Sequence, residues 1–347
     1  MAGGTGGHVI PAISIAEVLR NRDISVVWLG TQQGIESELV PAVGFDINYI
    51  DIEGLRGTRV LKWFKAPYTL IKAIFQAITV IRRESPDIIL GLGGFASGPG
   101  GVAAKLMRLP LIIHEQNSIP GTTNKILAKV ATRVLTAFPD TLPRGEWIGN
   151  PVRKEISSLS PKLLSTVNRS RPPRILILGG SLGATSINQK IPLALSSIEK
   201  KYRPEIRHQS GKVNLKETQQ IYKDLDLNAR VESFISNMAE AYEWADLVVC
   251  RAGALTVSEL AAAGVGALLI PYPYAADDHQ FHNGKWLVSH GAAYMVREKD
   301  LTNKLLASIL NEWLGNPEKL NSMAMNAKKS ARLGVAELVA DICMEPS

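Results

Sequence analysis

The sequence has few cysteines, no long uninterrupted apolar run and fewer acidic than basic residues. Each of these shortages argues against a class of site, segment or partner. Its 347 residues contain only Cys250 and Cys343, which lie far apart without metal-ligand spacing, so neither a disulfide framework nor a structural zinc site is expected. The longest uncharged apolar stretch, residues 260–276, is broken by two glycines and two prolines, which argues against a membrane span. Because residues 1–5 lack the basic and apolar regions of a signal peptide, we expect a cytosolic protein.

Basic residues outnumber acidic ones by 39 to 32, which gives a formal net charge of +7. A positive surface attracts phosphates, anionic lipid or nucleic acid, and the charge alone does not choose among them. The basic residues are dispersed and no recognised nucleic-acid-binding module is present, which disfavours a nucleic-acid partner.

The length exceeds what one hydrophobic core usually supports, so two domains are expected. Short, almost continuous apolar runs alternate with helical patterns, as in strands buried on both faces of a parallel sheet. These runs cover residues 25–29, 87–90, 111–113, 174–178, 246–249 and 267–270. The pattern predicts an α/β fold of parallel sheets flanked by helices, an architecture that appears twice along the chain. Residues 151–173, rich in Ser, Pro, Lys and Arg without periodicity, are the predicted linker.

Each half contains a glycine-rich loop that enters a helix, at residues 3–7 and 179–183. Backbone amides of such loops, with the positive end of the helix, can bind phosphate, although glycines also simply make tight turns. For either loop alone, both interpretations stay open. Val9 occupies the place of the third glycine of a dinucleotide fingerprint, and neither loop has a P-loop ending, which disfavours dehydrogenases and P-loop enzymes. Only two residues precede the first loop, where a strand is normal, so we expect the recorded start to be misplaced.

The stretch from residue 246 to Gly264 reads as a strand, a turn and an alanine-rich helix. Amides of residues 254–256 can meet a diphosphate, and Glu259 can accept hydrogen bonds from ribose hydroxyls. Thr256-Val257-Ser258-Glu259 also fits a capping box, in which Glu259 would only satisfy a backbone donor. The spacing of these residues alone favours the capping box over a ribose-binding role for Glu259.

Seven motifs occur in one order over most of the chain, from residue 3 to beyond Asn283. They are Gly3-Gly4-Thr5-Gly6-Gly7-His8, Gly93-Gly94-Phe95-Ala96-Ser97-Gly98-Pro99, His114-Glu115-Gln116-Asn117, Gly149-Asn150-Pro151-Val152-Arg153, Gly179-Gly180-Ser181, His208-Gln209-Ser210-Gly211-Lys212 and residues 251–264. With them the chain resembles the MurG family of N-acetylglucosaminyltransferases, in glycosyltransferase family 28. Phe95 departs from the family pattern, because a tyrosine is common there.

The resemblance implies a GT-B fold, with two doubly wound Rossmann-like domains facing across a cleft. An acceptor- and membrane-facing domain would cover residues 1–152, completed by a helix near 330–347, and residues 153–329 would bind UDP-N-acetylglucosamine. The implied reaction is inverting transfer of N-acetylglucosamine to lipid I, giving lipid II for peptidoglycan, without cofactor or metal. The alternatives are a UDP-N-acetylglucosamine 2-epimerase, which would lack the motif at residues 93–99, and a catalytically inactive membrane scaffold.

The resemblance also implies roles for individual residues. The backbone of Ile235 would read the uracil, and Glu259 would bind the ribose. The other donor-binding residues would be Ala254, Leu255, Thr256, Val257 and Ser258 along the nucleotide, Ser181 and Arg153 at the diphosphate, and Gln280 and Asn117 at the sugar. Thr5, Gly6 and Gly7 would line the junction of donor and acceptor.

His8 is the candidate catalytic base, because an imidazole titrates near working pH and the loop faces the substrate in the related enzymes. The alternative is that His8 only holds its turn by a hydrogen bond. Glu115 is the second candidate. His114, His208 and His290 are interpreted as structural. The cluster of Asp277, Asp278, His279 and His282 is interpreted as a solvated or sugar-binding loop rather than a metal site.

Residues 60–83 combine aromatic and aliphatic side chains with lysines and arginines, a pattern that suits a membrane interface or a packed amphipathic helix. We assign Lys62, Trp63, Phe64 and Lys65 to lipid, and Ile71, Ile74, Phe75 and Ile78 to the core. The expected location is peripheral, at the cytoplasmic face of the cell membrane. The expected partners are UDP-N-acetylglucosamine, lipid I and anionic lipid, with other cell-wall synthesis proteins as candidates.

Overall fold

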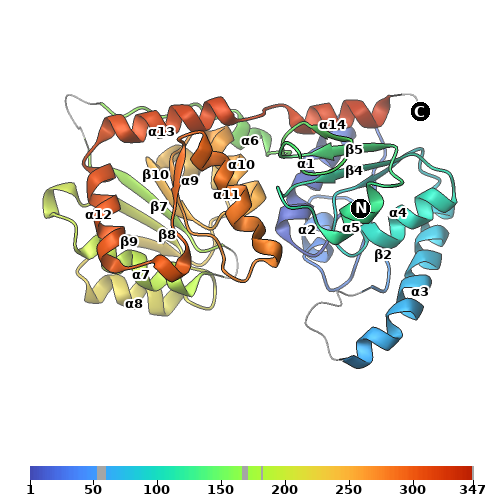
Figure 1. The fold of residues 1–347 in the computed structure, drawn as a ribbon, viewed down its shortest axis with the longest axis horizontal. Helices are drawn as coiled ribbons and strands as arrows, with labels where there is room; N and C mark the ends of the chain where they lie inside the picture. Colours follow the sequence, from blue (N-terminus) through green and yellow to red (C-terminus); the bar gives the residue numbers. More distant parts are fainter. Residues whose placement is uncertain (53–59, 166–170, 181–182, 346–347) are drawn as a thin grey trace. The chain divides into compact units, whose positions relative to one another are not determined.

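The computed structural model describes residues 1–52, 60–165, 171–180 and 183–345, with the backbone alone for residues 60–65 and Tyr202. The chain divides into two compact units. Unit 1 comprises Met1–Arg153 and Arg332–Ser347, and unit 2 comprises Lys154–Ala331. Each unit is built on parallel strands joined by helices, as the ribbon shows (Figure 1), and this confirms the predicted α/β class.

Unit 1 contains a two-stranded and a four-stranded parallel sheet, ordered β1-β2 and β3-β4-β5-β6. The strands are β1 (Val27–Gly30), β2 (Asp46–Tyr49), β3 (Ile89–Gly91), β4 (Leu111–Glu115), β5 (Arg133–Thr136) and β6 (Gly145–Trp147). The helices are α1 (Gly6–Arg20), α2 (Glu36–Ala42), α3 (Val60–Glu84), α4 (Ser97–Leu106), α5 (Thr122–Leu127) and α14 (Val335–Met344). The last of these returns the chain to unit 1, where it packs on α1.

The first two residues lie between β1 and β3. The Met1 amine donates to the Leu90 carbonyl at 2.7 Å, and the Leu92 amide donates to the Met1 carbonyl at 2.9 Å. On the other side, the Trp28 indole of β1 donates to the Ala2 carbonyl at 2.9 Å. These bonds fix the point from which the chain enters the glycine loop before α1.

Unit 2 contains one six-stranded parallel sheet, ordered β12-β11-β10-β7-β8-β9. Its strands are β7 (Arg174–Leu178), β8 (Glu205–Gln209), β9 (Ala229–Glu232), β10 (Leu247–Cys250), β11 (Ala267–Leu269) and β12 (Ala293–Met295). Its α-helices are α6 (Lys154–Ser157), α7 (Thr185–Ser196), α8 (Leu215–Asp224), α9 (Met238–Trp244), α10 (Ala254–Ala263), α11 (His279–Ser289), α12 (Asn303–Leu314) and α13 (Pro317–Ser330).

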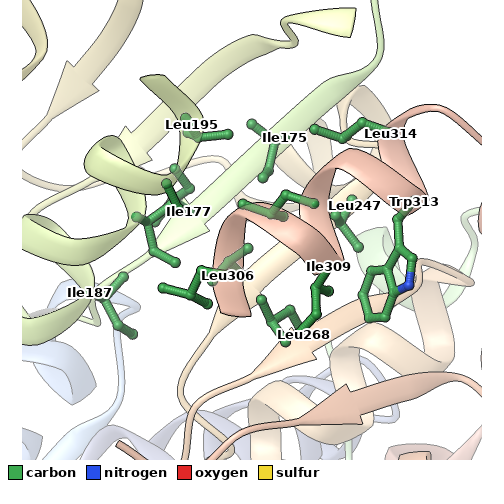
Figure 2. Close-up of a cluster of buried hydrophobic side chains, with 14 of the residues drawn as sticks. Ile175, Ile177, Ile187, Leu195, Leu247, Leu268, Leu306, Ile309, Trp313 and Leu314 are labelled. Carbon is green, nitrogen blue, oxygen red and sulfur yellow. The ribbon is translucent and has the colours of Figure 1, made fainter. Parts of the chain in front are cut away.

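The core of unit 2 explains why its strands are apolar almost without interruption. Figure 2 shows side chains of β7, β10 and β11, among them Ile177, Leu247 and Leu268, packed with helical side chains such as Ile187 and Leu306. All five are fully buried. Removing this apolar area from water is the main favourable term for the unit.

Residues 154–165 are not a linker, so that part of the linker prediction is wrong. They belong to unit 2, where the Lys328 ammonium donates to the Leu159 carbonyl at 2.6 Å. The Asn321 side chain also bonds both backbone groups of Leu164. The segment has little apolar periodicity because side chains of α13 hold its backbone by hydrogen bonds. Among the helices that the structure describes, none combines the length and the apolar character needed to cross a bilayer.

Candidate active site

In unit 2, α10 starts directly after the turn that follows β10. Gly253 is the N-cap, in an extended conformation, and the helix begins at Ala254 without a side-chain cap. Thr256 is therefore the third residue of the helix and Glu259 the sixth, so the capping-box alternative is wrong. First-turn amides have no partner within a helix, and the helix dipole makes this end attractive to an anion.

Glu259 is buried and oriented by a neighbouring helix. The Tyr242 hydroxyl of α9 donates to Glu259 Oε2 at 3.1 Å. Burial, together with the nearby Glu259 carboxylate, raises the pKa of the Cys250 thiol to about 12. A carboxylate held this way, one and a half turns into α10, is suited to receiving hydroxyl donors from a ligand.

Ile235 follows β9 and is buried, with its amide already bonded. The Ile235 N–H donates to Gln209 Oε1 at 2.8 Å. Because the Ile235 amide is bonded to Gln209, the Ile235 carbonyl is the backbone group of this residue that we expect a nucleobase to contact. Gln209, the last residue of β8, was not selected from the sequence, although it lies within the motif at residues 208–212.

His208 is a structural residue beside the second glycine loop. Asn188 donates through Nδ2 to the Ser210 carbonyl at 2.8 Å, so its Oδ1 faces His208 Nε2 at 3.0 Å and that nitrogen must carry the proton. The Tyr222 hydroxyl then donates to His208 Nδ1 at 2.9 Å. Burial lowers the pKa of His208 to about 3, which keeps the ring neutral. Ser181 of this loop lies outside the described residues.

Gln280 lies in the first turn of α11, where its Oε1 accepts from the Tyr272 amide at 2.9 Å. The two residues Asp277 and Asp278, which lead into this helix, both have left-handed backbone angles, with φ of 52° and 53°. Non-glycine residues rarely adopt this conformation, and such strain is often found in ligand-binding loops. In the described part of the chain, no group of three or more His, Cys, Asp or Glu side chains could hold a metal ion.

In unit 1, His8 lies in the first turn of α1, next to the glycine loop. His8 Nδ1 lies 3.3 Å from the Gly3 carbonyl, which can only accept, so Nδ1 carries the proton and Nε2 is the basic nitrogen. Thr5 Oγ1 lies 3.4 Å from the same Nδ1. Thr5 is the N-cap of α1, so the glycine loop, the helix start and the His8 imidazole lie next to one another. Both interpretations of His8, base and turn holder, are compatible with this geometry.

The glycine loop also contacts a buried carboxylate, Glu36, that was not among the predicted site residues. Glu36, the first residue of α2, is fully buried and accepts from the Gly4 amide at 2.9 Å. Its other oxygen accepts from the amide and the hydroxyl of Thr31, at 2.9 and 2.7 Å. The sequence signal was the spacing of glycines around it, at Gly30 and Gly34.

Glu115, the second candidate base, has its carboxylate oxygens occupied by local donors. Oε1 accepts from the backbone and side chain of Asn117, at 2.9 and 3.2 Å. Oε2 accepts from the Gly121 amide at 3.1 Å and from Asn124 at 2.9 Å. Because these bonds hold the loop after β4, the geometry favours a positioning role for Glu115 over proton transfer.

His114, next to Glu115, is buried and structural. Its Nε2 donates to the Gly149 carbonyl at 2.8 Å, and its Nδ1 accepts from Gln116 at 3.0 Å. Burial lowers the pKa of His114 to about 4. Asn150 donates to the Gln116 carbonyl at 3.1 Å, which ties the loop after β4 to the motif that ends at the half-buried Arg153.

Helix α3 packs along α4 (Figure 1) through small residues, and its large apolar residues are only partly in the core. Ala73 and Ala77 are fully buried, whereas Ile71 is 54% and Phe75 66% exposed. The assignment of Ile71 and Phe75 to the core is therefore wrong, because alanines make the close contact. Ile78 packs against the core and Ile74 is half-buried. The side chains of Lys62, Trp63, Phe64 and Lys65 lie outside the described part.

Two family models match the chain. Residues 1–136 match the glycosyltransferase family 28 N-terminal domain, and residues 174–339 match the glycosyltransferase family 28 C-terminal domain. Proteins of Cellvibrio japonicus and Nitrosococcus oceani are 49% and 48% identical, over 99% of this chain and 97% of theirs. Both are named UDP-N-acetylglucosamine–N-acetylmuramyl-(pentapeptide) pyrophosphoryl-undecaprenol N-acetylglucosamine transferase.

Comparison with solved structures points to the same family. The crystal structure of Acinetobacter baumannii MurG is similar, with a TM-score of 0.85 and 39% identity, over 99% of this chain and 97% of that one. A putative UDP-N-acetylglucosamine 2-epimerase from Listeria monocytogenes has a TM-score of 0.68 at 13% identity, over 97% of this chain and 92% of that one. At that identity the likeness shows a shared fold alone.

Proposed function

The chain belongs to glycosyltransferase family 28, and we propose that it transfers N-acetylglucosamine from UDP-N-acetylglucosamine to undecaprenyl-pyrophosphoryl-N-acetylmuramyl-pentapeptide. It is an N-acetylglucosamine transferase, like its curated relatives. The product, lipid II, is the lipid-linked unit used for peptidoglycan synthesis. The runner-up, a 2-epimerase, is supported by fold likeness only.

One observation of the site carries the assignment of the donor to unit 2. A buried carboxylate, Glu259, lies in the helix whose amino end follows the Gly253 turn. In this assignment the diphosphate lies against the first turn of α10, and Glu259 accepts from the ribose hydroxyls. The Ile235 carbonyl reads the uracil, and Gln280 contacts the sugar. Leu255 to Ser258 line the nucleotide.

In the reaction that we assign, the acceptor hydroxyl attacks C1 of the donor sugar and UDP departs, with inversion at C1. His8 Nε2 takes the proton of the attacking hydroxyl, since Nδ1 is protonated and faces the Gly3 carbonyl. The leaving diphosphate gains negative charge, which the α10 amides, Arg153 and Ser181 stabilise. Glu115 holds Asn117 toward the sugar, and Thr5, Gly6 and Gly7 line the junction.

The acceptor carries a polyprenyl chain, so we assign the exposed face of α3 to the membrane surface. Tyr68, Ile71 and Phe75 are exposed on this helix, at a spacing that places them on one face. Lys72 is exposed between them, and its ammonium pairs with Asp51 at 2.7 Å. Aromatic rings beside cations suit the headgroup region of anionic lipid. The residues 62–65 continue this helix. The enzyme would thus work as a peripheral protein on the cytoplasmic face.

The direct test is transfer of radiolabelled sugar from UDP-N-acetylglucosamine to a short-chain lipid I analogue. We expect a labelled lipid product with equimolar UDP and no dependence on added metal. Incubation without the acceptor is the control for hydrolysis, and mass analysis of the sugar separates transfer from epimerisation. Conversion of UDP-N-acetylglucosamine to its 2-epimer, with no labelled lipid, would contradict the proposal.

A further inference from the structure

Glu36 is a buried carboxylate that the reaction as assigned does not use. It is fully buried, and its hydrogen bonds go to two loops of unit 1. Oε2 accepts from the Gly4 amide, in the glycine loop before α1, and Oε1 accepts from the amide and hydroxyl of Thr31, after β1. Among the described residues no cation pairs with Glu36, so its hydrogen bonds serve to fix backbone. The carboxylate therefore joins the loop that carries His8 to the rigid end of β1.

The glycines around Glu36 leave room for its side chain. A Cβ atom on Gly3, Gly30 or Gly34 would lie 2.5, 2.9 and 2.0 Å from Glu36 atoms, closer than such contacts occur. Three separate glycines are thus shaped around one carboxylate. Gly4, the residue that donates to it, has φ of 87°, in the left-handed region that favours glycine. The local sequence is built for Glu36 to approach the loop backbone.

We propose that Glu36 is a positioning residue for sugar transfer. It holds the residue 3–7 loop so that Thr5 and His8 are presented to the acceptor hydroxyl. The inference rests on the proposed function, because the position of His8 matters only if the imidazole acts in the reaction. We assign Glu36 no contact with the donor, whose binding residues we place in unit 2, apart from Arg153, Asn117 and the junction residues of the glycine loop.

The Glu36→Gln variant tests this because it keeps the shape and removes one acceptor. A carboxylate accepts on both oxygens, whereas an amide accepts on one side and presents N–H groups on the other. The side-chain NH2 group of the variant then faces either the Gly4 amide or the Thr31 amide, both of which are donors. The loop therefore loses one of the hydrogen bonds that hold it. We expect kcat to fall about 10- to 100-fold, the scale of a small misplacement of a catalytic group. We expect KM for UDP-N-acetylglucosamine to change less than about twofold.

Two variants separate positioning from simple loss of stability. Thr31→Val removes one of the three donors, so its kcat should lie between those of wild type and Glu36→Gln. Asp246→Asn is the matched control in unit 2, where Asp246 is buried, accepts from Arg171 and the Arg174 amide, and precedes β10. Asp246→Asn should lower the melting temperature but leave kcat unchanged well below it.

A double-mutant cycle with His8→Ala identifies the group through which Glu36 acts. If Glu36 works by placing His8, Glu36→Gln should add little to the loss in kcat already caused by His8→Ala. Wild-type transfer to the lipid I analogue is measured in the same series. Absence of wild-type transfer would remove the proposed function itself. Normal wild-type transfer with normal kcat in Glu36→Gln, or full additivity with His8→Ala, would overturn the positioning role alone.

Discussion

Both units start a helix from a glycine-containing turn and place a buried carboxylate close by, yet the two carboxylates make different contacts. In unit 1, Glu36 comes from the following helix and accepts from the loop backbone at Gly4. In unit 2, Glu259 comes from inside the helix itself and accepts from the Tyr242 hydroxyl. The first carboxylate is used to shape its loop. The second is held by a side chain, at a position where a ligand can bind it.

This difference shows why glycine loops alone do not identify a ligand. An amide bonded to a built-in carboxylate, as at Gly4, is less available to phosphate, and the nearby negative charge disfavours a second anion. In α10, Glu259 lies beyond the first turn, so its carboxylate does not occupy the positive end of the helix, to which we assign the diphosphate. We therefore assign uncharged atoms of the substrates to the unit 1 loop and the charged part of the donor to unit 2.

The largest effect is expected from His8→Ala in unit 1. If His8 is the base, kcat should fall about 100- to 10,000-fold, while UDP affinity stays unchanged because the nucleotide is assigned to unit 2. Steady-state transfer kinetics and isothermal titration with UDP measure the two quantities. Near-normal turnover would favour the interpretation that His8 holds the turn.

Glu259→Ala should weaken UDP binding by roughly 1,000-fold, since two charge-assisted hydrogen bonds to the ribose are lost at about 2 kcal/mol each. Titration calorimetry with UDP measures this, and thermal melting checks that the variant is folded. Tyr242→Phe, which removes only the group that orients the carboxylate, should give a smaller loss. Unchanged affinity in folded Glu259→Ala would place the ribose elsewhere.

Stability against acid should depend on one neutral histidine in each unit. Burial lowers the pKa of His114 to about 4 and that of His208 to about 3, below the usual 6.5. Between pH 6.5 and these values only the unfolded histidines bind protons, so the free energy of unfolding falls as pH falls. The loss for His114 is about 3 kcal/mol by pH 4.

Urea denaturation at several pH values, with the unfolding transition of each unit followed separately, measures this pH dependence of the free energy of unfolding. His114→Asn should flatten the dependence in unit 1 and His208→Asn in unit 2, although both variants are less stable at neutral pH. An equally steep dependence in both variants would show that other groups carry the acid sensitivity.

The smallest effect is expected on the surface of unit 1. Ile71→Ser with Phe75→Ser should weaken binding to anionic vesicles roughly 10-fold with little change in melting temperature, because both side chains are exposed. Trp63→Ser with Phe64→Ser should act in the same direction. Ile81→Ser, a buried position of the same helix, should instead lower the melting temperature. Loss of stability without loss of vesicle binding in the first pair would show that α3 does not contact lipid.

The sequence was sufficient for the fold class because buried parallel strands have an unmistakable apolar pattern, as in residues 174–178. It was insufficient for α3, where apolar residues recur on more than one face and the small Ala73 and Ala77 make the packing contact. It also failed to separate the two roles of Glu259. The helix boundary at Gly253 settles that question against the capping box, and the boundary depends on where β10 ends.

Glu36 and Gln209 were missed for a different reason. Each bonds a backbone amide far away in sequence, Gly4 and Ile235 respectively, and neither contact leaves a local pattern. Such bonds are set by the arrangement of loops at the carboxyl edge of a sheet. Sequence motifs therefore identify the loop that contains the candidate catalytic residues, but not the buried side chain that holds this loop in place.

Hydrogen–deuterium exchange with and without saturating UDP compares the two glycine-containing turns in one measurement. The account predicts slower exchange in residues 254–260 and around Ile235 of unit 2, with the amides of residues 3–9 in unit 1 unchanged. Protection of residues 3–9 with no change at the start of α10 would contradict the assignment of the nucleotide to unit 2.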